Sequence, residues 1–363
     1  MGTFAISYRP NEEHSLGSET PELIVHFNHW QLAKGSRGLQ FIDIGFSFCN
    51  AHLIGQIKLI VPFVVSGGEV IDLSYTLQDI ENLKSVFNRI LRVNHNGDGS
   101  LSEVSNDNDP SWRFNFLLLT IDPGQVELTA RDEHSIYVVR LTEVQKRQIA
   151  AHPNRSLYMR LRILGNATTE LTSISKPSFS KPFLTSFYEE QMIEVNFNRV
   201  RNLPRTIVDT RDLPFTTSSM NYFLIKDSRY NFKSSNRPCD DLRRLEQRIW
   251  NNYITLPVKL MARNPTYYEH VQEQALKFNL AEARMSKEHL LAYQWDFRGD
   301  SDNFNVFAWF QREFINLRSF IIGLIVISLF FELTGNYLYD WLSNEPKQPI
   351  EQGTNAVKDG TAE

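Results

Sequence analysis

Arginines are concentrated between residues 199 and 248, where two groups follow one another in the sequence. A guanidinium is planar and always charged, and it binds phosphate or carboxylate through paired hydrogen bonds. If the strand that ends at Arg199 packs near a helix that starts at Asp240, the two groups line one pocket for a nucleotide-like ligand or an anionic headgroup. The alternative is a solvent-exposed surface that nearby aspartates neutralise. The candidate anion ligands are Arg199, Arg201, Arg205, Arg243, Arg244 and Arg248.

A second candidate site is a loop with oxygen-bearing side chains at alternate positions, Asn94, Asn96 and Asp98. Calcium prefers oxygen ligands at this spacing, but such a loop needs a bidentate glutamate at its twelfth position. This chain has Ser105 there. Asn-Gly and Asp-Gly pairs are also typical of exposed turns. We therefore expect an ordinary loop rather than a calcium site.

No motif in the chain identifies a reaction. The pairs Cys49/His52 and His26/His29 have no second matching pair, which a zinc site would need. The chain contains no Gly-x-Ser-x-Gly, Walker loop, Gly-x-Gly-x-x-Gly or His-Glu-x-x-His motif. We expect no metal and no cofactor, and a non-enzymatic role is favoured. A net charge of −4 gives no reason to expect nucleic acid as a partner.

An apolar segment near the C-terminus predicts a membrane anchor. Roughly 20 apolar residues in a helix cross a hydrocarbon layer of about 30 Å, and residues 320–342 have this length. Aromatic residues at helical spacing precede this segment, so residues 301–319 are predicted to form an amphipathic juxtamembrane segment. A polar tail, residues 343–363, is expected to be disordered. The alternative is a buried helix of a soluble protein.

The flanking charges predict the orientation of this anchor. Arg312 and Arg318 precede the apolar run, which favours a cytoplasmic position for that end. The N-terminal residues have no signal-peptide pattern, and two cysteines provide no disulfide framework, so the large N-terminal part is expected in the cytoplasm.

Polar and small residues inside the predicted span favour contact between helices. A carboxylate in lipid is costly and usually faces a partner or water, and small residues allow close helix packing. The alternative is that Glu332 lies near the headgroups of a tilted helix. The candidate association residues are Gly323, Ser328, Glu332, Gly335 and Asn336.

The remaining residues are predicted to form an α+β structure, mainly an antiparallel β-sandwich or barrel with inserted helices. Apolar residues alternate through residues 1–186, a period-two pattern that is typical of half-buried strands. In one of these strands Arg160 and Arg162 alternate with Met159 and Leu161, which predicts a solvent-facing side. Residues 76–93 and 142–151 are predicted as inserted helices. Residues 114–121 are apolar on both faces and predict a central strand.

A second region, residues 187–300, is predicted to contain strands and then helices. Strands are expected at 192–199 and 221–226, and helices from Asp240, at 267–284 and at 287–295. The Ser-, Thr- and Pro-rich residues 169–182 are expected to form a linker or a long loop.

The sequence therefore predicts a single-pass membrane protein whose cytoplasmic β-rich domain binds an unidentified ligand or protein. Its anchor lies in the lipid bilayer and is expected to self-associate, which would suit a membrane-acting effector of the antiviral-defence type. Two alternatives remain open. One is an anchored enzyme that acts on a phosphate-bearing substrate, and the other is a scaffold subunit of a membrane complex.

Overall fold

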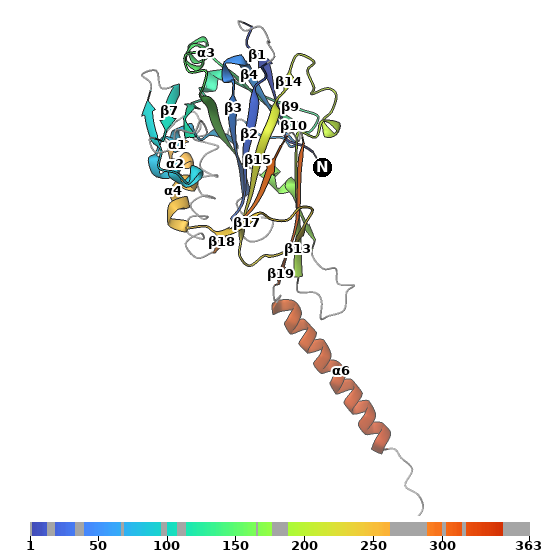
Figure 1. Cartoon of the computed structure of the whole chain (residues 1–363). Helices are drawn as coiled ribbons and strands as arrows, with labels where there is room; N and C mark the ends of the chain where they lie inside the picture. Colours follow the sequence, from blue (N-terminus) through green and yellow to red (C-terminus); the bar gives the residue numbers. More distant parts are fainter. Residues whose placement is uncertain are drawn as a thin grey trace, which may run out of the picture. The chain divides into compact units, whose positions relative to one another are not determined.

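Two compact units make up the chain in the computed structural model (Figure 1). The first contains Met1–Lys176 and Tyr188–Glu313, and the second contains Pro177–Phe187 and Phe314–Glu363. The expected domain boundary after residue 186 therefore does not separate two units, because strands from both sides of it share the first unit. The structure describes residues 2–12, 19–32, 40–66, 69–95, 100–106, 114–164, 166–175, 188–261, 289–299, 303–313 and 317–343.

The largest element of the first unit is a ten-stranded sheet. Its neighbouring strands are antiparallel, except for the parallel pairs β2/β15 and β8/β11. The strand β5 (Val70–Asp72) pairs with β11 outside the main order. The order is β17 (Asp241–Arg244), β18 (Leu290–Arg298), β15 (Thr216–Asp227), β2 (Glu22–Gln31), β3 (Gln40–Cys49), β11 (Ser156–Ile163), β8 (Phe116–Leu119), β7 (Leu101–Ser105) and β6 (Arg92–His95).

Two smaller sheets cover one face of this sheet. One has the order β14 (Leu213–Pro214), β1 (Ala5–Pro10), β4 (Ile54–Val61), β10 (His134–Arg140) and β9 (Val126–Arg131). The other has the order β12 (Thr172–Ser175), β13 (Tyr188–Phe197), β19 (Phe304–Glu313) and β16 (Asn231–Ser235).

The three sheets share one hydrophobic core, to which the alternating apolar residues of each contribute, such as Phe27, Leu59 and Val195. Burial of one face of each strand is the physical reason for the period-two pattern. Among the described residues none of the sheets closes on itself, so the strands form open sheets packed face to face rather than a barrel. The predicted β-rich fold is confirmed.

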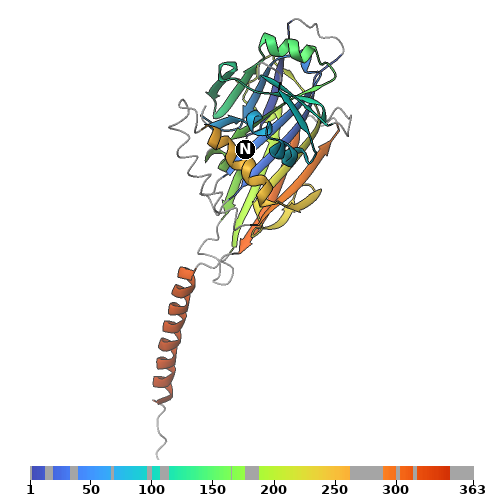
Figure 2. The same ribbon diagram turned by 90° about the vertical axis from the view of Figure 1, so that its left-hand side faces the viewer.

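Helices cover part of the other face of the ten-stranded sheet (Figures 1 and 2). They are α1 (Ser74–Leu77), α2 (Ile80–Phe87) and α4 (Gln247–Met261). The side chain of Asp79 accepts a hydrogen bond from the backbone N of Asn82 and caps the start of α2. Asn88, in the left-handed conformation with φ of 52°, ends α2. Leu83, Trp250 and Ile254 pack in a second core with the sheet.

Both predicted inserted helices are present in the structure. Residues 76–93 contain the end of α1 and all of α2, and β6 follows from Arg92. The second is α3 (Glu143–Ala150), which begins with a capping box between Thr142 and Gln145. The central strand expected within residues 114–121 is β8, which is buried along its whole length.

Three expectations of helix were wrong, because strand pairing determined the local structure. The helix expected from Asp240 is the strand β17, and α4 begins only at Gln247. The helix expected at 287–295 is replaced by β18. The segment expected as an amphipathic helix within 301–319 contains β19, which pairs with β13 and β16. Its buried residues alternate as Phe304, Val306, Ala308 and Phe310, the period of a strand.

Two further expectations concern residues that the structure describes in part or not at all. The residues expected as a linker, 169–182, contribute the end of a short 3-10 helix and then β12, which pairs with β13. The helix expected at 267–284 lies outside the described residues.

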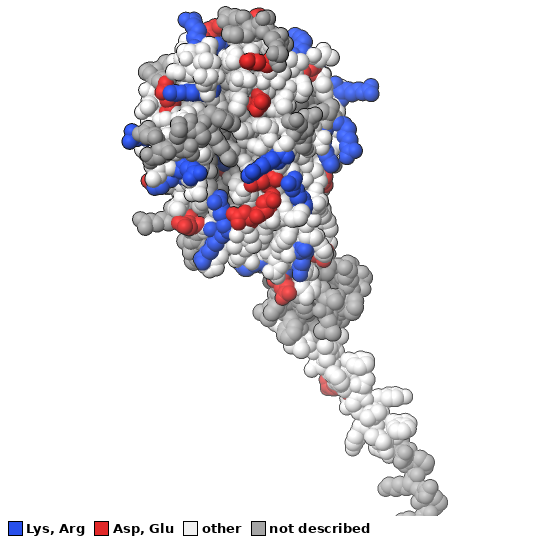
Figure 3. Space-filling model, in the orientation of Figure 1, with Lys and Arg blue, Asp and Glu red and all other residues white. Residues whose placement is uncertain are grey.

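The second unit contains the helix α6 (Leu317–Ser343), whose 27 residues correspond to a length of about 40 Å. Large apolar side chains are exposed along this helix, among them Ile321, Leu324, Phe331, Leu338 and Trp341. In Figure 3 its described part carries almost no charged atoms. Among the described residues, no helix is both long and apolar enough to cross a membrane.

We predict that alanine at Phe310 costs far more stability than alanine at Phe307. Phe310 is fully buried against Phe232 and Tyr293, whereas Phe307 lies on the partly exposed face of β19. Loss of the buried ring is expected to lower the free energy of unfolding by about 3–5 kcal/mol, and loss of the other by less than half as much. Chemical denaturation measures both variants. Equal losses would contradict the strand, because residues 307 and 310 share one face of a helix.

Candidate functional site

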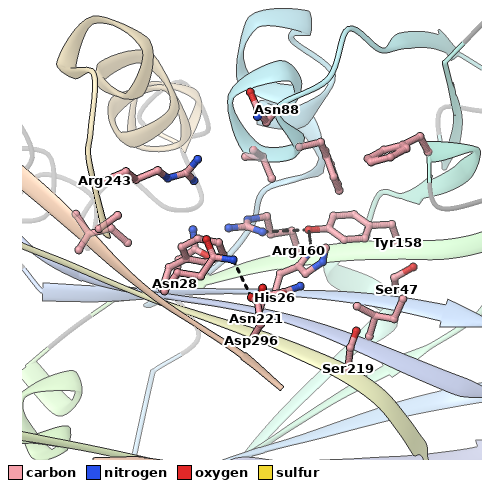
Figure 4. A pocket seen from close by; sticks show the side chains of 18 of the residues that line it. His26, Asn28, Ser47, Asn88, Tyr158, Arg160, Ser219, Asn221, Arg243 and Asp296 are labelled. Atoms are coloured by element: carbon pink, nitrogen blue, oxygen red, sulfur yellow. Dashed lines mark hydrogen bonds between the residues drawn. The ribbon is translucent and has the colours of Figure 1, made fainter. Parts of the chain in front are cut away.

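A cavity of about 690 Å³ lies on the face of the ten-stranded sheet that also packs against α2 and α4. Its lining residues come from β2, β3, β8, β11, β15, β17 and β18 of the sheet, and from α2 and α4. This volume is in the range of sites for small molecules and cofactors. Figure 4 shows the side chains around it. The cavity lies entirely within the first unit.

A row of directly opposed residues crosses five neighbouring strands along the floor of the cavity. The register pairs each with the next: Arg160, Gly45, His26, Asn221 and Asp296. Neighbouring strands are about 4.8 Å apart, so the row spans about 19 Å between the backbones of its two ends. A cation therefore stands at one end and a carboxylate at the other, with polar groups between them.

Arg160 is the most unusual residue of this row, because it is only 1% exposed. Its Nε donates a hydrogen bond of 2.7 Å to Tyr253 Oη, and its Nη1 donates one of 3.0 Å to Tyr158 Oη. Among the described residues, Nη2 has no hydrogen-bond partner. A buried guanidinium nitrogen without a partner is costly. Arg160 is also one of the lining residues of the cavity, so its positive charge favours an anion there.

The second arginine of the same strand is fully paired. Arg162 and Asp43 are both 0% exposed and form a buried ion pair of 2.7 Å. The Oδ2 atom of Asp43 also accepts hydrogen bonds from Trp30 Nε1 at 3.1 Å and Tyr253 Oη at 2.9 Å. The carboxylate of Asp43 thus pairs directly with Arg162, whereas the hydrogen bonds of Arg160 go to the hydroxyls of Tyr253 and Tyr158 and its charge interacts with Asp43 from a greater distance.

The two tyrosines beside Arg160 remain neutral. Burial raises the pKa of Tyr158 and of Tyr253, although the charge of Arg160 lowers both in part. As a neutral phenol, Tyr253 accepts from Arg160 and donates to Asp43. Tyr158 Oη lies 3.4 Å from His26 Nδ1 and so continues the polar chain toward the floor (Figure 4). These contacts hold Arg160 in one orientation.

Gly45 provides the space that this arrangement needs. A Cβ atom at position 45 would lie 2.2 Å from Tyr158 Oη and 2.9 Å from Arg160 Nη1. Gly45 stands in the middle of β3, between the opposed residues Arg160 and His26. Because Gly45 has no side chain, the side chains of Tyr158 and Arg160 can lie over β3.

Aromatic rings and two further arginines complete the cavity. Phe87, Phe116, Phe223 and Trp250 are among its lining residues. The guanidinium of Arg243 lies 5.6 Å from the centre of the Phe223 ring, and Arg298, two residues after Asp296 on β18, also lines the cavity. Among the described lining residues there are three arginines, including Arg160, and one aspartate, so their formal charge is positive. Aromatic faces and guanidinium groups together suit a ligand with a planar ring and an anionic group.

The structure places the predicted arginines in separate parts of the first unit. Arg199 and Arg201 lie in the turn after β13, where the backbone N of Arg199 donates to Thr3 Oγ1. Arg205 is exposed in the following segment. Arg243 and Arg244 are on β17, and Arg244 lies 2.6 Å from His289. Arg248 is in α4, but its side chain is outside the described residues. Of the five described side chains, only that of Arg243 lines the cavity.

The buried arginines Arg160 and Arg162 were not among the predicted site residues. Arg160 and Arg162 were expected on a solvent-facing side, which was wrong, because both are buried beneath α4. One signal was available. Asp43 interrupts an otherwise apolar strand, and a buried carboxylate requires a charged or donating partner.

None of the remaining predicted residues that the structure describes lines the cavity. Asn94 is on β6, while Asn96 and Asp98 lie outside the described residues. Among the described residues no group of metal-ligating side chains was found. The five predicted association residues all lie on α6, and a Cβ atom at Gly335 would contact nothing within 4 Å.

We predict that Gly45→Ala lowers the free energy of unfolding by about 1–3 kcal/mol, because overpacking forces Tyr158 and Arg160 to move. Urea denaturation measures the loss. Adding Tyr158→Phe removes the closest clashing atom and is expected to restore part of the stability. Gly124→Ala is the control, since its new Cβ would meet nothing closer than 3.4 Å. A Gly45→Ala variant as stable as the control would show that the space above β3 is not needed.

Comparison with known proteins adds no function to this geometry. The sequence matches no protein-family model, and no curated protein sequence matches it significantly.

Proposed function

We propose that this protein is a membrane-anchored binding protein whose first unit holds a small, ring-bearing anion in the cavity above the ten-stranded sheet. The observation that carries this proposal is the buried Nη2 atom of Arg160, which has no partner among the described residues and belongs to a residue that lines the cavity. An anion placed near Arg160 would add to the compensation of its buried charge, because the carboxylate of Asp43 forms its ion pair with Arg162 and acts on Arg160 only at longer range.

The other lining residues support the same class of ligand. Arg243 is exposed on β17, and Figure 4 shows its side chain extending toward the interior of the cavity. Phe87, Phe223 and Trp250 provide apolar surface for a planar group. A group that combines a ring with a phosphate or carboxylate would use both features, whereas a simple inorganic anion would leave the aromatic walls without a contact.

The exposed surface of α6 supports the anchor. Its apolar side chains are exposed through most of its described length, and a large exposed apolar surface usually marks contact with a membrane or a protein. Glu332, Asn336 and Asp340 make its second half less apolar than a typical span. Polar side chains within a span favour association between helices, so we include self-association through Glu332, Gly335 and Asn336 in the proposal.

We predict that the full chain binds 1-naphthyl phosphate, a ring-bearing anion, with one site per chain. Arg243→Gln is expected to weaken binding by roughly 10-fold, since a guanidinium beside an aromatic ring contributes about 0.5–2 kcal/mol. Titration calorimetry of the protein in a mild detergent measures the affinity. Arg244→Gln is the matched control, because it removes the same charge from the next residue of β17, outside the cavity lining. Equal effects of the two variants would contradict binding in the cavity.

We predict that the full chain remains in membranes after carbonate extraction and that a chain ending at Glu313 is released. The cut keeps β19, which lies between β13 and β16 in its sheet. In sealed vesicles, only a tag at the C-terminus should resist protease if the first unit is cytoplasmic. A cooperative unfolding transition of the shortened chain serves as the control for folding. Release of the full chain by carbonate would refute the anchor.

A further inference from the structure

We propose that the ligand of the cavity is a nucleotide, with its phosphate at Arg160 and its base at a block of four residues on β15 and β18. This inference rests on the proposed function and goes beyond it by naming the ligand class. The block is formed by two directly opposed pairs, Asn221 with Asp296 and Phe223 with Gln294. All four residues line the cavity.

This block offers the contacts that a nucleobase requires. The ring of Phe223 provides a stacking surface, and the guanidinium of Arg243, 5.6 Å from its centre, adds a second planar group. Asn221, Gln294 and Asp296, which line the cavity together with Phe223, supply amide donors, amide acceptors and a carboxylate. The carboxylate of Asp296 accepts a hydrogen bond of 2.7 Å from Gln294 Nε2, which orients the amide. Side chains of this kind recognise the edges of bases.

The distance between Arg160 and the block on β15 and β18 suits a ligand in which a sugar separates the phosphate from the base. Arg160 is on β11, and β3 and β2 separate it from the block on β15 and β18. Three spacings of about 4.8 Å between neighbouring strands place the backbones of β11 and β15 about 14 Å apart. The long side chain of Arg160 shortens this gap, and His26 and Asn28 provide polar groups along the floor between the two parts, where a sugar would lie.

The same polar groups argue against an anionic lipid or fatty acid as the ligand. An acyl chain offers no hydrogen bonds, so the amides and the carboxylate of the block would lose water without replacement. His26, Asn28 and Asn221 would then face a hydrocarbon chain along the floor. A ligand with hydrogen-bonding groups at its far end avoids this cost. The polar floor therefore favours a nucleotide over a purely apolar anion.

The test compares AMP, GMP, CMP and UMP with 1-naphthyl phosphate, which has a ring and a phosphate but no hydrogen-bonding edge. Titration calorimetry with the full chain in detergent is expected to show at least one nucleotide binding 10-fold or more tightly than 1-naphthyl phosphate. Asn221→Ala is expected to reduce this preference by about 10-fold, because one or two base contacts are lost. Asn94→Ala, an exposed residue of β6, is the control and should leave the preference unchanged.

The outcomes separate this inference from the proposed function. If 1-naphthyl phosphate binds in a way that depends on Arg243 and no nucleotide binds more tightly, the nucleotide assignment is overturned and the binding of a ring-bearing anion stands. Tighter binding of oleate than of every nucleotide would likewise overturn the assignment in favour of a lipid. If neither 1-naphthyl phosphate nor any nucleotide binds, the proposed function fails as well. Arg160→Lys keeps the positive charge but loses the paired donors of the planar guanidinium. It is expected to weaken the binding of every phosphate ligand while the protein stays folded.

Discussion

The buried ion pair between Asp43 and Arg162 is the interaction on which the helix-covered side of the ten-stranded sheet depends. It joins β3 to β11, and its partners extend it to α4, because Arg162 Nη1 donates to the backbone O of Ile254 and Tyr253 donates to Asp43. Two charges in a low-dielectric interior are tolerated only when their remaining hydrogen-bonding groups are satisfied. The sequence meets this condition by placing Trp30 and Tyr253 around the same carboxylate.

This arrangement has a consequence for the neighbouring arginine. One carboxylate serves Arg162, and Arg160 is held beside it by two neutral tyrosines. The helix α4 is thus attached to the sheet through groups that also leave one guanidinium nitrogen of Arg160 without a hydrogen-bond partner among the described residues. If an anion binds beside Arg160 as proposed, binding and stability are coupled, because the anion adds to the compensation of this buried charge that Asp43 and the two tyrosines provide. Gly45 makes the arrangement possible by leaving space above β3.

Much of the β-structure was predictable, because burial of one strand face imposes a period of two. The alternation in residues 42–48, 57–63 and 159–163 corresponds to β3, β4 and β11. The failures at β17, β18 and β19 have a common cause. Their residues also fit a helical period, and pairing with distant strands decides between the two structures. Arg160 was assigned to the wrong environment for a related reason, since a polar residue on one strand face is normally exposed.

The sequence by itself determined that the chain is rich in strands, that two short helices are inserted among them, and that a long apolar segment lies near its end. These properties follow from local periodicity and composition, which act over a few residues. Only the tertiary structure decided that Arg160, Gly45, His26, Asn221 and Asp296 form one row. They come from five strands that are far apart in the sequence, and the register that aligns them is set by the packing of whole sheets.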